Sequence, residues 1–287
     1  MIYLDSGATT MEKPPSVAWA MAHAVGEMSS PGRGNYPASQ KAMQTAFSCR
    51  EAAAELFGVP SPEQVVFTSN ATHGLNIAIR TLVRPGCRVA VSGYEHNAVT
   101  RVLHSIPGVE IVVIDAPLFR PEKMLEGFQK ALRRGVDVVI CNHVSNVFGC
   151  IQPVEELAML CKKCHTPLIV DASQSAGILP VSLSAWEAAF VAMPGHKGLY
   201  GPQGMGLLLC GQKAQPLLCG GTGSASRSPT MPAGPPDRLE AGTHNMPGIA
   251  GLLEGIKFVR RTGPEGIALR EQRLTPRATV GPSRLPG

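Results

Sequence analysis

A lysine beside a histidine in a glycine-rich turn is the residue of this sequence with the clearest potential for covalent chemistry. Lys197 follows His196 between Gly195 and Gly198, shortly after the apolar run 189–193. A lysine buried near other positive groups has a lowered pKa, which makes its amine a nucleophile that can form a Schiff base with a carbonyl compound. A solvated surface charge would explain the glycines and the apolar run less well. We therefore predict a catalytic role for Lys197.

An acidic residue also ends an apolar run. Asp171 follows the apolar residues 168–170, and Gln174 stands three positions later. A buried carboxylate is costly unless a partner compensates it. One such partner is a protonated pyridine nitrogen, which the carboxylate would keep cationic so that the ring accepts electrons from a substrate carbanion. The other is the following turn, which Asp171 would cap. The sequence leaves both interpretations open.

Two further polar residues follow apolar runs. Thr72 begins an expected helix, where free backbone N–H groups and the positive end of the helix dipole can bind a phosphate group. Taken alone, Thr72 is more simply a helix cap. His96 is either a hydrogen-bonded structural residue or a flat ring that stacks on an aromatic cofactor. Whether Thr72 and His96 have a functional role depends on whether they lie close to Lys197 and Asp171 in the fold.

Each of these residues follows a short run of the kind that forms a buried strand. Within these runs, the odd-numbered and the even-numbered positions are both mostly apolar, which predicts strands covered on both faces. We expect strands at 65–68, 88–92, 110–114, 136–141, 168–171, 189–193 and 205–209, and helices at 39–57, 72–83, 121–134 and 154–164. This alternation predicts an α/β domain with a mostly parallel sheet, in which ligands gather at the carboxyl ends of the strands.

Two later segments lack this periodicity. Residues 220–236 are rich in Gly, Pro and Ser, which predicts a long irregular loop before a helix at 248–259. Beyond about Leu274, prolines and glycines leave no helical or strand period. We expect an irregular tail there, of the kind found at a truncated or frameshifted end.

Charge and hydropathy exclude several classes of protein. The formal net charge is +5, but residues 260–287 contain six arginines and two glutamates. The rest of the chain is therefore close to neutral and does not predict a nucleic-acid-binding face. No early apolar run has the length of a signal peptide, and none approaches a membrane span. We expect a cytoplasmic protein with neither a nucleic-acid nor a membrane partner.

The eight cysteines do not predict a disulfide framework. In a chain of this length without a secretory signal we expect them to stay reduced, several as small hydrophobes in apolar runs. Residues 161–165 read CKKCH, which fits the pattern of covalent haem attachment. Because this short pattern falls between an amphipathic segment and a buried strand, we interpret it as a chance occurrence and expect no metal.

Seven segments, in order and with matching spacing, resemble the class V aminotransferase family of pyridoxal-phosphate (PLP) enzymes, and within it the cysteine desulfurase and selenocysteine lyase branch. The resemblance runs from Ile2 to about Leu274. Its segments are YLDSGATT at 3–10, TSNAT at 68–72, EHN at 95–97, HVSNVFG at 143–149, VDASQ at 170–174, GHK at 195–197 and EAGT at 240–243. Any one of these is weak, but their order and spacing together are specific.

The resemblance implies a role for each residue around the cofactor ring. Lys197 would be the Schiff-base lysine and catalytic acid and base, and His96 would stack on the ring. Asp171 would pair with the pyridine nitrogen. Gln174 would bond the phenolic oxygen, and Asn146 would lie beside that oxygen and the substrate.

The resemblance also implies a site for the cofactor phosphate. Ala71, Thr72 and His196 would hold it, and Thr243 would complete the site from the other subunit of a homodimer.

The implied fold is that of the fold type I PLP-dependent transferases, with a mostly parallel sheet sandwiched between helices in three layers. Residues 1–15 would be an N-terminal segment of the active-site and small-domain region, and 16–262 the PLP-binding large domain. Residues 263–287 would begin a small C-terminal domain, largely missing from this chain, and end in an irregular tail. The family's sulfur-accepting cysteine and its carboxylate-binding arginine belong to that small domain.

In the cysteine desulfurase branch, L-cysteine yields L-alanine, and its sulfur becomes an enzyme persulfide that a sulfur-acceptor protein could receive. Two alternatives stay open. One is another class V reaction, either amino transfer or selenocysteine lysis. The other is an inactive truncated module that binds PLP without turnover.

The sequence departs from the family pattern at three places. Pro194 stands where a hydroxyl residue usually donates to the phosphate, and His73 replaces the glutamate that often follows the phosphate-binding threonine. Residues 34–36 read GNY where Ser-Gly-His is common. The first departure removes one expected phosphate donor.

Overall fold

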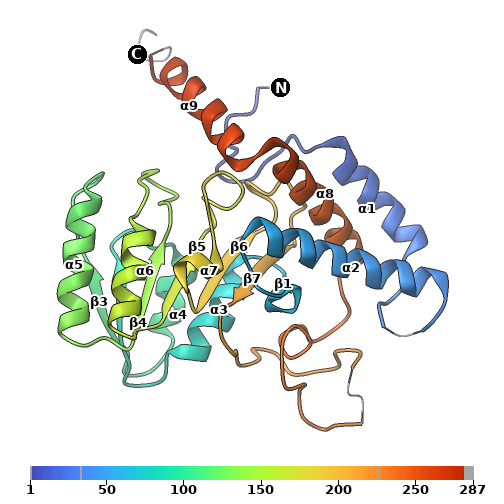
Figure 1. Ribbon diagram of the computed structural model, residues 1–287, viewed down its shortest axis with the longest axis horizontal. Coiled ribbons are helices and arrows are strands. Elements are labelled where there is room, and N and C mark those ends of the chain that lie inside the picture. The colour runs from blue at the N-terminus through green and yellow to red at the C-terminus, as the bar shows by residue number, and fades with distance from the viewer. Residues whose placement is uncertain (1, 33, 225–226, 281–287) are drawn as a thin grey trace.

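One seven-stranded sheet forms the centre of the molecule (Figure 1). The computed structural model describes residues 2–32, 34–224 and 227–280. Within them the strand order is β1-β7-β6-β5-β4-β2-β3. The strands are β1 Val65–Thr68, β2 Arg88–Ser92, β3 Glu110–Ile114, β4 Val138–Asn142, β5 Leu168–Asp171, β6 Phe190–Pro194 and β7 Gly206–Cys210. All seven expected strands are present, with β4, β6 and β7 shifted by one or two residues.

The sheet is mostly parallel, as predicted. Strands β3, β2, β4, β5 and β6 run parallel to one another. Strand β7 lies antiparallel between β1 and β6. The carboxyl ends of β2, β4, β5 and β6 therefore meet at one edge of the sheet, where residues that follow these strands can converge.

Helices cover both faces of the sheet, which confirms the three-layer α/β arrangement. They are α1 Pro15–Glu27, α2 Pro37–Leu56, α3 Ala71–Leu82, α4 Asn97–His104, α5 Pro121–Arg133, α6 Val154–Lys163, α7 Leu183–Trp186, α8 Met246–Thr262 and α9 Pro264–Val280. Residues of α3 and α4 pack on one face, and residues of α2, α5, α6, α7 and α8 pack on the other. Helix α1 lies outside, against α8 (Figure 1).

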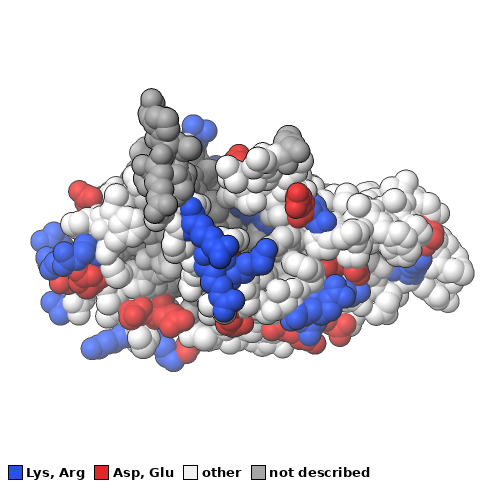
Figure 2. All heavy atoms as spheres, turned by 90° about the horizontal axis from the view of Figure 1, so that it is seen from above, with Lys and Arg blue, Asp and Glu red and all other residues white. Residues whose placement is uncertain are grey.

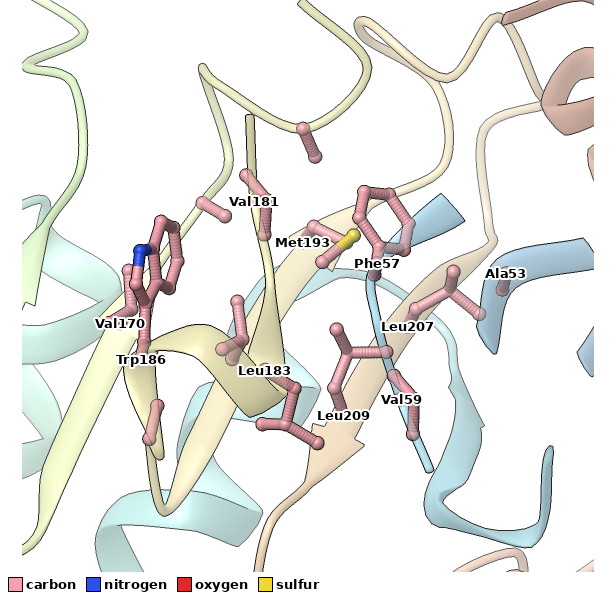
Figure 3. Packing of buried hydrophobic residues seen from close by; sticks show 14 of the residues in the cluster. Ala53, Phe57, Val59, Val170, Val181, Leu183, Trp186, Met193, Leu207 and Leu209 are labelled. Atoms are coloured by element: carbon pink, nitrogen blue, oxygen red, sulfur yellow. The ribbon is translucent and has the colours of Figure 1, made fainter. Parts of the chain in front are cut away.

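Alternate residues of each central strand enter opposite cores. In β7, Leu207 and Leu209 join the core under α2 and α8, whereas Leu208 joins the core under α3 and α4. Figure 3 shows the first of these cores, to which Phe57, Met193 and the two β7 leucines all belong. Two-sided burial of this kind requires strands that are apolar on both alternations, which the sequence has.

The edge strand β3 departs from that rule. Glu110 is exposed, and the Val113 side chain is 58% exposed. Strand β3 pairs only with β2 in the described sheet, so its other edge has no neighbouring strand. The prediction that every strand is covered on both faces was therefore wrong for β3.

Helix α9 corrects the prediction of an irregular tail. The helix continues past Leu274 to Val280 with Pro276 inside it, and only Ile267 of this helix is buried. The remaining part of the predicted tail, residues 281–287, lies outside the described residues. The irregular loop at 220–236 is confirmed for its described residues, which contain neither helix nor strand.

Charged side chains of both signs lie on the face of the molecule that Figure 2 shows. On the face shown in Figure 2, lysine and arginine side chains lie interspersed with aspartate and glutamate. Among the described residues, no helix is both long enough and apolar enough to span a bilayer.

The CKKCH segment does not present its two thiols together. Cys161 is buried in the core and Cys164 is exposed. Burial raises the pKa of the Cys161 thiol to about 12. Residues 2–32, 34–224 and 227–280 contain no cluster of His, Cys, Asp and Glu that could hold a metal ion.

Candidate active site

Residues from several elements surround a cavity of about 260 Å³ at the carboxyl edge of the sheet. Eight of the nine predicted site residues line it: Ala71, Thr72, His96, Asn146, Asp171, Gln174, His196 and Lys197. They come from the end of β5, from the start of α3 and from the segments that follow β2, β4, β5 and β6. The carboxyl-edge rule for parallel sheets thus brings distant parts of the sequence into one site.

Lys197 lies half-buried in the turn after β6, which ends at Pro194. Burial lowers the pKa of its amine, and the nearby Asp171 carboxylate partly opposes this shift. The turn needs glycine at position 198, because a Cβ there would lie 2.4 Å from the carbonyl oxygen of Ala176. The close approach of two backbone segments therefore fixes where the lysine emerges.

Asp171 caps the following turn and also lines the cavity, while its pairing with a pyridine nitrogen stays a prediction. Its Oδ1 accepts hydrogen bonds from the backbone N–H of Ser173, at 2.9 Å, and from the Ser173 hydroxyl, so it caps the following turn. It also lines the cavity while only 4% exposed. Burial raises the pKa of its carboxyl group, and Ser173, His96 and Lys197 oppose that rise. A cation in the cavity would stabilise the carboxylate further.

Helix α3 begins at the cavity wall. The interpretation of Thr72 as a cap was wrong, because Asn70 caps the helix by accepting from the N–H of His73 at 2.9 Å. Ala71 and Thr72 are the first two residues of α3, and both line the cavity. The first N–H groups of a helix have no partner within it and carry its positive dipole end, which suits an anion.

His96 has its ring orientation set by the backbone. It precedes α4, and its Nδ1 accepts from the N–H of Ala98 at 3.0 Å. A ring nitrogen that accepts carries no proton, so the proton of a neutral ring lies on Nε2. The structural and the functional interpretations of His96 are therefore compatible, since one nitrogen holds the helix while the ring lines the cavity.

A second cavity, of about 540 Å³, adjoins the first. Asn146, Gln174 and Lys197 line both cavities. The second is lined also by Tyr3 and by Glu271 of α9. The lysine therefore lies where the two cavities meet.

The N-terminal segment contributes contacts that the sequence analysis did not assign. Thr10 donates through its hydroxyl to the carbonyl oxygen of Lys197 at 2.6 Å, and its N–H donates to that of His196 at 3.0 Å. Gln174 donates through Nε2 to the carbonyl oxygen of Gly7 at 3.2 Å. The segment YLDSGATT was part of the family resemblance, but its contacts span more than 160 positions and no spacing rule reveals them.

Thr243 is the one predicted site residue that the structure places elsewhere. It lines a separate cavity of about 420 Å³ with Ser69 and His73. The loop that carries it is fixed by Glu240, which forms a buried bidentate ion pair with Arg50 at 2.8 and 2.6 Å. The predicted action of Thr243 on another subunit stays a prediction.

A second buried acid lies under the site. Glu95 is partly exposed as a residue, but its carboxyl group lies inside the protein. Its Oε1 accepts from the Ser92 hydroxyl at 2.5 Å and from the N–H of Asn142 at 2.8 Å, whereas Oε2 is buried without a partner among the described residues. Burial raises the pKa of Glu95 to about 8, and the nearby Asp171 carboxylate adds to the rise.

This raised pKa predicts a pH-dependent loss of stability. The folded protein holds the Glu95 proton more tightly than the unfolded chain, so the stability from this group is complete below its ordinary pKa of 4.5. It declines as the pH rises towards about 8, by a few kcal/mol. Glu95→Gln keeps a neutral group and should flatten that decline, as measured by urea unfolding between pH 5 and 9. Glu63→Gln, at an exposed position, should leave the wild-type profile unchanged; identical profiles for wild type and Glu95→Gln would contradict the assignment.

Comparison with known proteins gives a consistent result. The family described as Aminotransferase class-V matches residues 2–286. A probable cysteine desulfurase from Pyrococcus abyssi is 30% identical over 293 residues, covering 98% of this chain and 72% of that protein. A cysteine desulfurase from Escherichia coli O17:K52:H18 is 32% identical over 292 residues, covering 96% and 70%. Against a longer probable cysteine desulfurase from Mycolicibacterium paratuberculosis, at 28% identity, the chain spans 44% of the relative's length.

Solved structures show the same likeness. The apo structure of a cysteine desulfurase from Thermococcus onnurineus NA1 superposes with a TM-score of 0.87 at 31% identity, covering 98% of this chain and 72% of that one. An S-sulfonic acid form of a cysteine desulfurase from Escherichia coli superposes with a TM-score of 0.84 at 24% identity and 74% coverage of its chain, which supports the fold.

Proposed function

The chain belongs to the class V aminotransferase family of PLP-dependent enzymes, and from this premise we propose a cysteine desulfurase-like function for it. The reaction would convert L-cysteine to L-alanine and pass the sulfur to a thiol, which becomes a persulfide. The cysteine C–S bond breaks, an S–S bond forms, and the thiol proton balances the new methyl group. One observation carries the proposal: Lys197 and the buried Asp171 line the same cavity as the start of α3.

The residues present fit PLP. Asp171 is a buried carboxylate that lacks a full counter-ion, which suits a protonated pyridine nitrogen. The first N–H groups of α3 suit a phosphate group. The pKa of Lys197 is lowered by burial, so its amine is available to an aldehyde. When bound, PLP supplies an electron sink for the substrate carbanion.

We propose that the residues of the cavity divide the remaining work. Lys197 would hold the cofactor through Nζ and afterwards move a proton at the substrate. His96 would lie against the cofactor ring, held by Ala98 in one orientation. Gln174 and Asn146 would orient the phenolic oxygen and the substrate at the boundary of the two cavities.

We propose phosphate binding by Ala71, Thr72 and His196, with Thr243 of a second copy completing the site of a homodimer. The exposed position of Thr243, away from the cavity of its own chain, supports an action on another copy. Pro194 has neither a hydroxyl nor an N–H group, so it donates nothing to the phosphate.

The wider assignments are proposals of the same kind. Residues 16–262 would form the PLP-binding large domain, with 1–15 as an N-terminal active-site segment. Residues 263–287 would start the small domain. The protein would act in the cytoplasm and deliver sulfur to an acceptor protein.

Product analysis tests the function. Protein loaded with PLP is incubated with L-cysteine and a thiol acceptor, and the amino-acid products are quantified. We expect alanine and persulfide sulfur in equal amounts. 3-Mercaptopyruvate as the carbon product would indicate transfer of the amino group instead, and PLP binding without alanine would reduce the chain to a binding module. The same assay with selenocysteine as the substrate distinguishes a selenocysteine lyase from a cysteine desulfurase.

A further inference from the structure

Thr9 contacts both the backbone and the ring of His196. Its Oγ1 lies 2.9 Å from His196 Nδ1, and its hydroxyl is also placed to donate to the carbonyl oxygen of His196 at 3.2 Å. Thr9 is partly buried and belongs to the N-terminal segment, 187 positions away in the sequence. No role was assigned to this threonine from the sequence.

A hydroxyl group has a single proton, so Thr9 cannot donate to both partners at once. If it donates to the carbonyl oxygen, it must accept from Nδ1–H, and a neutral ring then has no proton on Nε2. If it donates to Nδ1, the ring proton is on Nε2, which becomes a donor. The orientation of one hydroxyl therefore decides whether a neutral His196 can donate through Nε2.

The surroundings favour donation to the ring. The carbonyl oxygen of His196 already accepts from the N–H of Thr10 at 3.0 Å, so it does not depend on Thr9. The contact with Nδ1 is also the shorter of the two Thr9 contacts. Thr9 can therefore donate to Nδ1 without leaving that carbonyl unsatisfied.

His196 needs this control because its ring is held neutral. Burial lowers the pKa of His196, and the charges of Lys197 and Lys13 lower it further. A cationic ring would donate from both nitrogens, but a neutral ring donates from only one. Within the described residues, Nε2 of His196 has no hydrogen-bond partner, although the residue lines the cavity.

We propose that Thr9 is a positioning residue that sets the tautomer of His196, so that Nε2–H is available to a phosphate group in the cavity. The inference rests on the proposed PLP function and extends it. It assigns part of the phosphate recognition to the N-terminal segment. The absence of a donor at Pro194 leaves fewer side chains to perform this task.

Paired cofactor titrations test the inference. Affinities for PLP and for pyridoxal, which has the aldehyde ring but no phosphate, are measured for wild type, Thr9→Val and Thr9→Ser. Thr9→Val should weaken PLP binding about tenfold and leave pyridoxal binding unchanged, and Thr9→Ser should restore PLP binding. Thr10→Val is the matched control, because it removes a hydroxyl from the same segment that bonds Lys197 rather than the ring. It should not change the ratio of the two affinities.

A nitrogen NMR spectrum provides a second readout that does not need the cofactor. In histidine-labelled, cofactor-free protein, the His196 signals, assigned with His196→Gln, should show the proton on Nε2 in wild type and a shift towards Nδ1 in Thr9→Val. Equal losses of PLP and pyridoxal affinity, or an Nδ1–H ring in wild type, would overturn the inference. If wild type fails to bind PLP at all, the proposed function fails, while the tautomer result still decides the role of Thr9.

Discussion

Lys197→Ala is expected to abolish the absorption band near the visible edge that PLP gives when its aldehyde is joined to a lysine amine. Turnover with L-cysteine should fall by roughly 10,000-fold or more, because the residue would both hold the cofactor and move a proton. The physical basis is the half-buried amine with its lowered pKa at the junction of two cavities. Spectra recorded during PLP titration, followed by alanine quantification, provide the measurement.

Lys13→Ala is the matched control for this experiment. Lys13 is also partly buried with a pKa lowered by burial, and it lies near His196 and bonds the carbonyl oxygen of Thr10. It does not line the cavity that holds Lys197 and Asp171. The control variant should keep the band. An unchanged band in Lys197→Ala would show that PLP is not joined to Lys197.

The strands could be predicted from sequence because burial on both faces leaves a strong local signal. Strands β1, β2, β3 and β5 have the predicted bounds. The start of β4 was predicted too early, at Val136, because Asp137 was included in the apolar run as a single polar residue. That residue accepts from the N–H of Arg88 at 2.7 Å and lies before the strand. Because the strand ends were nearly correct, so was the list of residues that follow them.

The helices that were missed lack the expected local signals. Helix α1 buries only Val17 and Ala24, while Trp19 and Val25 are exposed, so its sequence shows no apolar stripe. Helix α4 is capped by His96, and histidine is not among the usual N-cap residues. Helix α9 contains a proline, which was taken as the end of regular structure.

The parts of the site that could not be predicted depend on long-range contacts. Asp171 ends a recognisable strand, Lys197 and Thr72 each follow one, and the convergence of strand ends at the carboxyl edge of the sheet brings the three together. The contacts of Thr9 with His196 join two segments that no strand or helix connects directly. Similarly, the sequence favoured Thr72 as the cap of α3, whereas the structure has Asn70 in that role. Only the backbone geometry decides which side chain accepts the hydrogen bond.

Substitution of Asp171 separates its two roles. Asp171→Asn keeps an oxygen that can accept from the Ser173 N–H and hydroxyl, but it removes the carboxylate charge. We expect stability to be preserved and turnover to fall roughly 1,000-fold, because a neutral amide would not keep the pyridine nitrogen of PLP protonated. Asp171→Ala should lose the same turnover and also about 1 kcal/mol of unfolding free energy, since the turn loses its cap. Steady-state kinetics and urea unfolding of both variants provide the measurements.

The comparison of the two variants decides between charge and capping. If Asp171 acted only as a cap, Asp171→Asn would be nearly as active as wild type, and Asp171→Ala would lose stability alone. If the charge acts on the cofactor, turnover in the two variants falls together while their stabilities differ. Removing a buried carboxylate whose pKa is raised by burial also removes a desolvation cost, so Asp171→Asn should not be less stable than wild type at neutral pH. A stable but inactive Asp171→Asn would therefore show that the fold retains this buried acid for its chemistry, at the expense of stability.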